Sequence, residues 1–302
     1  MKEIIKRYIK GLGFLLTEYT NSIIQDKLSS LQKASQISLQ QQYKSIADEY
    51  IQEKRSYLPS LEEVELRCYS QNGEDGILLY IFSLIGTTNK RVVEISAGDG
   101  LECNAANLII NHGWFGLLID GNSKLIENGK KAYRKLRDTR SCPPILKSAW
   151  VTKENINEVI QVEGFTGEID LFSLDLDGID YWLLKELDIV SPRVIVLEYQ
   201  NIWKTERAVT VPYSSDFRHN ASKYDTNYMG ASLPAFIKLL KGKGYRYVGS
   251  QSLGFNAFFI KNGIGDKLLP EVSPDEIFKY AKVIHSIKGR LDKVKDLPWM
   301  EV

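Results

Sequence analysis

From Tyr69 onward, short apolar stretches alternate along the chain with stretches that have helical spacing. Because strands that alternate with helices are joined by right-handed crossovers, we predict an α/β fold with a parallel sheet covered on both faces. The expected strands are Arg91–Ile95, Gly116–Ile119, Ile145–Trp150, Ile169–Asp175, Arg193–Tyr199, Tyr245–Ser250 and Ala257–Lys261. The expected helices are Asn104–Asn111, Ser123–Arg137, Lys153–Gln161, Tyr181–Leu187 and Ser232–Lys241. The last two of the seven strands are close enough in sequence to pair as an antiparallel hairpin.

Residues 1–56 differ in character from the rest of the chain, with no proline, few glycines and many Lys, Gln, Ile, Leu and Ser. We therefore predict a helical N-terminal extension over residues 1–60 and a main domain over residues 61–302. Gly11 and Gly13 are expected to interrupt the extension, because glycine weakens a helix. A second, polar helix is expected to run from about residue 20 to residue 54.

The extension begins with four apolar residues spaced for one helical face: Ile4, Ile5, Tyr8 and Ile9. One interpretation is that residues 1–56 pack on the main domain or on a partner subunit, which would give a homo-oligomer. The alternative is a peripheral contact with a membrane surface, because a short basic amphipathic helix can lie in the lipid interface.

The overall composition narrows the classes of function and location. The formal net charge is +1, so composition gives no reason to expect a nucleic-acid partner. Three cysteines, Cys68, Cys103 and Cys142, form no CxxC pair, which suits a reducing compartment. No apolar run reaches the length of about 18 residues that a spanning helix needs, and the start lacks the pattern of a signal peptide. We therefore expect a cytoplasmic protein, with a peripheral position at the inner membrane as the alternative.

Two glycines, Gly98 and Gly100, follow the predicted strand Arg91–Ile95. Open parallel sheets bind ligands beyond the carboxyl ends of their strands, and glycine there lets the backbone approach a ligand closely. A tight turn without a ligand would explain the glycines equally well. Asp120 favours the ligand site, because it ends the next strand, where a carboxylate can accept hydrogen bonds from both hydroxyls of a ribose.

The turn is not a dinucleotide fingerprint, because the third glycine of GxGxxG would fall on Cys103. It is similar instead to the acidic-x-Gly-x-Gly-x-Gly turn of methyltransferases. Glu94 supplies the acidic residue, and Ser96 replaces the first glycine of that pattern.

The segment Tyr69–Leu78, with the sequence YSQNGEDGIL, closely resembles the SQNGEDGIL opening of a bacterial group related to FkbM-like methyltransferases. The resemblance covers about residues 67–261. It implies a Rossmann-like class I methyltransferase fold, S-adenosyl-L-methionine as methyl donor, and a hydroxyl-bearing acceptor such as a sugar, a glycan or a natural product. The further matching segments are Glu94–Gly100 with Glu102 and Asn104, Gly113–Gly121, Ser173–Gly178, Gly230–Leu233, Gly244-Tyr245 and Gly254–Phe259.

The same resemblance implies a set of cofactor contacts. Gln71, Asn72, Glu74 and Asp75 are expected to fold over the amino-acid end of the cofactor, unless they cap the helix that starts near Gly76. Trp150 is expected to stack on adenine, with burial in the core as the alternative. The other expected contacts come from the turn, the strand ends and their neighbours: Glu94, Ser96, Gly98, Gly100, Asn104, Asp120, Gly121 and Asp175.

Acidic residues gather where the fourth and fifth predicted strands end. Asp175 and Asp177 should share one face, with Glu198 beside them and Asn201 just beyond. Such oxygens suit Mg²⁺ or Mn²⁺, so we predict a metal site of these four residues. The set is similar to that of metal-dependent O-methyltransferases, although there the last two residues are adjacent and here they are three apart. The alternative is that Asp177 caps the next helix and Asp175 orients the acceptor without a cation.

Of the three histidines, His219 is the best placed to act as a general base, because it lies in the polar loop 211–228. The alternative is a solvated loop histidine. His112 is expected to be structural, and His285 is expected to lie in a C-terminal helix. Three basic residues can attract a phosphate on the acceptor or can be solvated surface: Lys204, Arg207 and Arg218.

Three hypotheses about function follow. The first is an O-methyltransferase that acts on a glycan, a nucleotide-linked sugar or a similar small acceptor, with Asp175, Asp177 and His219 as catalytic residues. The second is an N-methyltransferase, or an enzyme that methylates a phosphorus-linked group. The third is an inactive cofactor-binding scaffold that recruits partners through its N-terminal helices. The acidic residues at the strand ends argue against this third hypothesis, because an inactive site would not need them.

Overall fold

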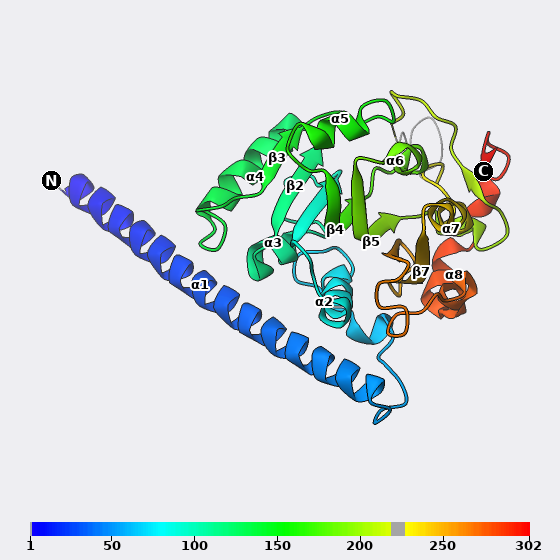
Figure 1. Ribbon diagram of the computed structural model, residues 1–302. Helices are drawn as coiled ribbons and strands as arrows, with labels where there is room; N and C mark the ends of the chain where they lie inside the picture. The colour runs from blue at the N-terminus through cyan, green and yellow to red at the C-terminus, as the bar shows by residue number, and fades with distance from the viewer. Residues whose placement is uncertain (1, 219–226) are drawn as a thin grey trace.

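The computed structural model describes residues 2–218 and 227–302, with side chains from residue 26 onward and at Thr20 and Ile24. Seven strands form one sheet in the order β3-β2-β1-β4-β5-β8-β7 (Figure 1). β1 to β5 pair in parallel, whereas β8 pairs antiparallel with both β5 and β7. These strands are Arg91–Ile95 (β1), Phe115–Asp120 (β2), Ile145–Ser148 (β3), Gly167–Leu174 (β4), Val190–Glu198 (β5), Tyr245–Ser250 (β7) and Asn256–Lys261 (β8). The predicted α/β fold, with a mostly parallel seven-stranded sheet and an antiparallel C-terminal hairpin, is confirmed.

Helices cover both faces of this sheet. They are α1 (Lys2–Ile51), α2 (Glu74–Ile85), α3 (Ala106–His112), α4 (Ser123–Lys135), α5 (Ile156–Gln161), α6 (Asp180–Glu186), α7 (Leu233–Gly242) and α8 (Ala281–Ile287). Near the C-terminus, Val209–Thr210 (β6) and Met300–Glu301 (β9) form a separate antiparallel pair. Trp203 and Trp299 pack edge to face beside this pair, with ring centroids 5.4 Å apart.

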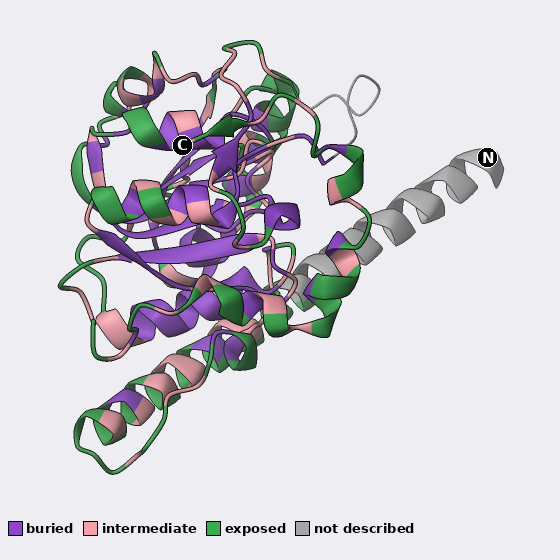
Figure 2. Cartoon of the chain, turned by 90° about the vertical axis from the view of Figure 1, so that its right-hand side faces the viewer, coloured by how far each residue is buried: buried purple, intermediate pink, exposed green. Residues whose placement is uncertain are grey.

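The sheet is buried on both faces, as the apolar character of its strands requires (Figure 2). Successive strand residues point to opposite faces, so Val92 and Val93 belong to different core clusters. One cluster contains residues of α2, α3 and α4, including Tyr80 and Ile109, and the other contains residues of α5, α6 and α7, such as Phe236. The two layers leave the carboxyl ends of the parallel strands as the edge where a ligand can bind.

The first helix departs from the prediction. α1 is one continuous helix of 50 residues, so the expected interruption at Gly11 and Gly13 is wrong. A glycine in a helix costs roughly 1 kcal/mol relative to alanine, which weakens a helix but does not by itself end it. No proline follows in this segment to end the helix.

The C-terminal half of α1 packs on the domain. Tyr43 lies edge to face against Tyr80 of α2, with ring centroids 5.0 Å apart. Gln36 is buried, and its Nε2 donates to Asn107 Oδ1 at 3.1 Å, while its Oε1 lies 2.6 Å from His112 Nε2. Burial lowers the pKa of His112 to about 4, so this histidine has the structural role that was predicted. In the described part of the chain, none of the helices combines the length and apolar character needed to cross a membrane.

A buried ion pair joins the elements at the amino end of the sheet. Arg193 Nη1 on β5 donates to Asp170 Oδ1 on β4 at 2.7 Å, and the side chain of Asp170 is fully buried. The same carboxylate accepts the backbone amides of Thr88, Asn89 and Lys90, just before β1. Burial alone would raise the pKa of Asp170, but the hydrogen bonds from Arg193 and from these amides outweigh it, so the pKa is lowered.

Replacing Arg193 by methionine should lower the free energy of unfolding by about 3–5 kcal/mol, because it leaves the Asp170 charge buried without its cation. Urea unfolding measures this. The matched control is Arg67→Met. Arg67 forms an ion pair with Glu102 in which the two side chains are 65% and 61% exposed, so this substitution should change the free energy of unfolding by less than about 1 kcal/mol. Equal effects of the two substitutions would contradict the assignment.

Candidate functional site

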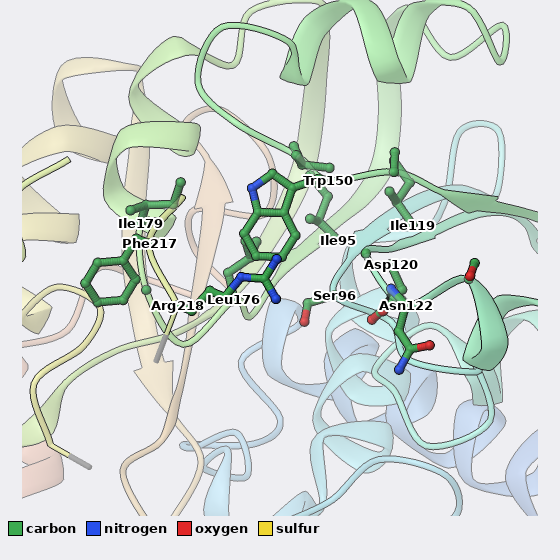
Figure 3. A pocket seen from close by; sticks show the side chains of 15 residues that line it. Ile95, Ser96, Ile119, Asp120, Asn122, Trp150, Leu176, Ile179, Phe217 and Arg218 are labelled. Carbon is green, nitrogen blue, oxygen red and sulfur yellow. Dashed lines mark hydrogen bonds between the residues drawn. The ribbon is translucent and has the colours of Figure 1, made fainter. Parts of the chain in front are cut away.

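A cavity of 590 Å³ opens at the carboxyl ends of β1, β2 and β4 (Figure 3). β1 and β4 are neighbours at the centre of the sheet, where the strand order reverses, and open sheets bind ligands at this position. Asp120 and Asn122 line one side of the cavity, Phe217 and Ile179 line the opposite side, and Trp150 lies between them. The other lining residues are Ile95, Ser96, Ile119, Gly121, Ser123, Ala149, Val151, Leu176, Gly178 and Arg218.

The turn after β1 has an unusual backbone. Ser96, Gly98 and Gly100 have φ angles of +67°, +60° and +75°, in the left-handed region that glycine adopts most readily. Ser96 therefore occupies the backbone conformation that a glycine would favour at this place in the motif. Gly100 is also needed for packing, because a Cβ there would lie 2.6 Å from Leu118 Cδ1.

Asp120 connects this turn to the end of β2. Its Oδ2 accepts from Gly98 N at 2.9 Å, and its Oδ1 accepts from Asn122 N at 2.7 Å. The residue is half-buried and lines the cavity. Because a carboxylate can accept about four hydrogen bonds, both oxygens keep capacity for ligand hydroxyls.

Trp150 lies in the cavity wall and not in the core, because 42% of the residue is exposed. Its Nε1 donates to Ser215 O at 2.7 Å, and the Arg218 guanidinium carbon lies 4.6 Å from its ring centroid. A Cβ on Gly121 would lie 3.0 Å from Trp150 Cε3, so the missing side chain of Gly121 makes room for the indole.

A second, smaller cavity of 50 Å³ adjoins the same turn, and Ser96 lines both cavities. Its lining is rich in acidic and amide side chains: Gln71, Glu74, Glu94, Ser96, Glu102, Cys103, Asn104, Asp175 and Asn256. Asn256 Nδ2 donates to Glu74 Oε1 at 2.7 Å. Asn256 Oδ1 is buried and has no hydrogen-bond partner among the described residues.

Sequence reasoning missed Asn256 as a site residue. It lies in the segment Gly254–Phe259 that carries part of the resemblance, which was the only signal in the sequence. Only the pairing of β5 with β8, which sets Asn256 opposite Glu198, brings it to this edge of the sheet.

Glu94 is buried, and its carboxylate holds the turn after β1 in place through hydrogen bonds. Oε1 accepts from Asn104 N and from Ser173 Oγ, both at 3.0 Å, and Oε2 accepts from Ala105 N at 2.7 Å. Burial raises the pKa of Glu94, while these hydrogen bonds oppose the shift. Asn104 adds a bond of 3.1 Å from its Nδ2 to Ser173 Oγ.

The segment Gln71–Asp75 divides into two roles. Gln71 and Glu74 line the smaller cavity, and Glu74 Oε2 accepts from Asn72 N at 2.9 Å. Asp75 does not line either cavity. Its Oδ2 accepts the backbone amides of Cys68, Tyr69 and Ser70, at distances of 2.8, 2.6 and 2.8 Å. Asp75 thus holds the loop 68–70 that precedes α2, and the amides from which it accepts do not belong to that helix, so it is not the expected helix cap.

Asp175, Asp177 and Glu198 each bring a carboxylate oxygen to within 4.8 Å of the others. Asp177 lies beyond the end of β4 with a φ of +54°, so the turn and not the strand brings it to this cluster. Burial raises the pKa of Asp175 to about 7, and the charge of Asp177 adds to the rise. The pKa of Glu198 is also raised, first by burial and then by Asp175. Asp175 and Glu198 therefore hold a proton near neutral pH or need a cation.

Asp180, and not Asp177, holds the turn before α6. Its carboxylate accepts from Leu176 N at 2.7 Å and from Gly178 N at 2.9 Å. The α6 N-cap position has no side-chain cap, so the alternative that Asp177 caps this helix is wrong.

The structure corrects the place of Asn201 in the predicted metal site. Asn201 is buried, its Nδ2 donates to Gly254 O at 2.9 Å, and its Oδ1 accepts from Arg290 Nη1 at 3.3 Å. Both ends of the amide are thus engaged in a separate network, and the residue begins the short 3-10 helix Asn201–Trp203 that follows β5.

The remaining predicted residues have the following positions. His219 lies outside the described residues, and His285 lies in α8 as expected. Arg207 forms an ion pair with Glu301 on β9, which favours a structural role over contact with an acceptor phosphate.

Comparisons with known proteins give low similarities. No family model and no curated protein match the sequence. Among solved structures, PKMT2 from Rickettsia typhi in complex with AdoHcy is 13% identical, with 60% of this chain and 52% of that chain covered and a TM-score of 0.39. The CurJ carbon methyltransferase is 11% identical over 62% of this chain and 52% of that one, with a TM-score of 0.40. The glycopeptide N-methyltransferase MtfA, complexed with S-adenosyl-L-methionine, is 11% identical over 59% of this chain and 84% of that one, with a TM-score of 0.34.

The chain thus spans about half the length of the first two of these structures, at 52% of each. The fold is assigned from the strand order of this chain, and the FkbM-like resemblance stays a prediction.

The raised pKa of Asp175 has a consequence for stability. A raised folded-state pKa means that the group stabilises the fold below its unfolded pKa of about 4, and that this contribution is lost as the pH rises toward about 7. The free energy of unfolding of Asp175→Asn, relative to the unsubstituted protein, should therefore increase by about 1 kcal/mol or more over this range. Chemical unfolding at several pH values measures this, with the exposed Asp296→Asn as the matched control. A difference that stays constant with pH would contradict the assignment.

Proposed function

We propose that this chain is an S-adenosyl-L-methionine-dependent methyltransferase. The observation that carries the proposal is the pair of cavities that share Ser96 at the switch point of the sheet, one beside Asp120 and Trp150 and the other beside Asp175 and Asn256. A ligand with a nucleoside at one end and an amino acid at the other would fill both. The volume of 590 Å³ lies within the range of about 300–1,000 Å³ that is usual for such sites.

The side chains of both cavities fit the two ends of this cofactor. Asp120 would accept the ribose hydroxyls, and the exposed indole of Trp150 would stack on the adenine ring. The positive φ angles at Ser96 and Gly98 let the backbone between the cavities lie close to the ligand. The unpaired Oδ1 of Asn256, with Glu74 beside it, would accept hydrogen bonds from the ammonium group of the amino-acid end.

The cofactor supplies an electrophilic methyl group, so the protein has to align the acceptor and remove its proton. Asp175 lines the smaller cavity, and its pKa of about 7 suits a general base near neutral pH. Asp177 and Glu198 lie within 4.8 Å of it and can hold neighbouring hydroxyls of the acceptor through hydrogen bonds. We therefore favour a sugar, a glycan or another small hydroxyl-bearing acceptor, and an amine or a phosphorus-linked group is the second candidate.

When a divalent cation occupies the acidic cluster, it takes the place of Asp175 as the group that activates the acceptor hydroxyl. Asp175, Asp177 and Glu198 would hold Mg²⁺ or Mn²⁺ through carboxylate oxygens, which both ions prefer. A cation there would oppose the burial and the repulsion from Asp177 that raise the pKa of Asp175, and would stabilise an ionised hydroxyl of the acceptor.

Replacing Asp120 by alanine should weaken S-adenosyl-L-methionine binding by about tenfold to a hundredfold, because charge-assisted hydrogen bonds to the ribose are worth about 1.5–3 kcal/mol. Isothermal titration calorimetry measures this. The matched control is Asp99→Ala, which removes a carboxylate of the same turn that lines neither cavity. Unchanged affinity in Asp120→Ala would rule out the ribose assignment.

Mn²⁺ should bind to the apoprotein in calorimetry, and Asp177→Asn should weaken this binding by about tenfold or more, since it removes one charged ligand. The exposed Asp188→Asn, on the loop after α6, is the control and should bind Mn²⁺ normally. Methyl transfer from labelled donor to candidate acceptors should stop in EDTA and return with Mg²⁺ or Mn²⁺. Full activity in EDTA would exclude the cation while leaving the methyltransferase proposal intact.

A further inference from the structure

The N-terminal half of α1 extends away from the rest of the chain (Figure 1). Ile24 is the apolar residue of this half whose side chain is described, and it is 48% exposed; Leu28 and Leu31, which follow it in the helix, are exposed at 54% and 68%. Gly11 and Gly13 each weaken the helix by roughly 1 kcal/mol, and most helices depend on packing against a partner for stability. A projecting helix of this composition therefore implies a partner.

The sequence of this half contains a heptad repeat. Six apolar residues are separated alternately by four and three positions, and on the observed helix positions with this spacing form one stripe, which we term the apolar seam. The seam consists of Ile5, Ile9, Leu12, Leu16, Tyr19 and Ile23. Such a repeat is typical of helices that pair with another helix of the same kind.

We propose that the apolar seam is where two copies of this chain associate, as an antiparallel pair of helices related by a two-fold axis. In this register, Ile5 lies opposite the partner's Ile23, Ile9 opposite the partner's Tyr19, and Leu12 opposite the partner's Leu16. The spacing is symmetric about position 14, so the same six residues meet in both directions, as a two-fold interface requires.

The charges favour the antiparallel over the parallel arrangement. The same register places Lys2 opposite the partner's Asp26, and symmetry makes this pair occur twice. Asp26 is exposed and forms no ion pair with another described residue. A parallel pair would instead bring the basic residues Lys2, Lys6, Arg7 and Lys10 of both copies together at one end.

The length of the seam fits the projecting part of the helix. From residue 2 to residue 26 the helix rises about 36 Å at about 1.5 Å per residue. Just beyond this point α1 meets its own domain, where Lys33 Nζ lies 3.2 Å from Asp138 Oδ1 and Gln36 is buried. The partner helix would therefore cover the projecting part and leave the contacts of α1 with its own domain intact.

Sedimentation equilibrium of the full chain tests the association. The unsubstituted protein should be a dimer, and Leu12→Asp/Leu16→Asp should be a monomer, because it places charges at the centre of the seam. The matched control is Thr17→Asp/Asn21→Asp, which adds the same charge on the outer side of the helix and should stay dimeric. All variants should bind S-adenosyl-L-methionine alike, so failure of the dimer and failure of the proposed function are distinguishable.

Charge reversal tests the register. Lys2→Glu alone and Asp26→Lys alone should each raise the dissociation constant of the dimer by roughly tenfold, because each creates two repulsive pairs. The double variant Lys2→Glu/Asp26→Lys should restore the original value. Absence of this rescue would overturn the antiparallel register.

Two further outcomes would overturn the proposal. One is a monomeric unsubstituted protein, or a Leu12→Asp/Leu16→Asp variant that stays dimeric. The other is flotation of the monomer with vesicles of phosphatidylglycerol and phosphatidylcholine, which would identify a lipid surface as the partner of the seam. Dimerisation without flotation supports association of two copies.

Discussion

The buried carboxylate of Glu94 ties together the end of β1, the turn that follows and the neighbouring strand β4. Its oxygens accept the amides of Asn104 and Ala105 and the hydroxyl of Ser173. A buried charged group is costly unless it is hydrogen-bonded, so the surrounding donors must keep their positions. This constraint fixes the start of the turn, where Ser96 has a left-handed backbone, and through it the junction of the two cavities. Glu94 also lines the smaller cavity, so the same carboxylate holds the turn and forms part of the candidate site.

The pKa values of buried acidic residues are shifted in opposite directions at the two ends of the sheet. At the amino end, Arg193 and backbone amides surround Asp170 and lower its pKa, so the charge stabilises the fold. At the carboxyl end, Asp175 and Glu198 have raised pKa values, and neither forms an ion pair with a described lysine or arginine. Perturbed groups without a neutralising cation are candidates for a functional site, because they cost stability that the fold must supply elsewhere.

Much of the fold could be predicted because its signals are local. Apolar runs bounded by turn residues gave the bounds of β1 and β7 without error, and crossover rules gave the parallel sheet. The turn at Gly98 and the acidic group at Asp120 could likewise be found, since a strand end and its following turn are adjacent in sequence. The continuity of α1 could not be predicted in this way. Two glycines weaken a helix locally, and the sequence around them does not show whether the helix continues through them.

By itself, the sequence determined the order of the elements, the edge of the sheet at which the candidate site lies, and the acidic character of that edge. Tertiary structure alone decided which polar groups are free to act there. Asp75 and Asn201 looked equivalent to their neighbours in sequence, yet folding turned Asp75 toward three backbone amides and Asn201 toward Arg290. Asn256 joined the site through the pairing of β5 with β8, between segments 58 residues apart at Glu198 and Asn256. The reason is physical: hydrogen-bond partners and burial are properties of the packed chain, and spacing along the sequence does not contain them.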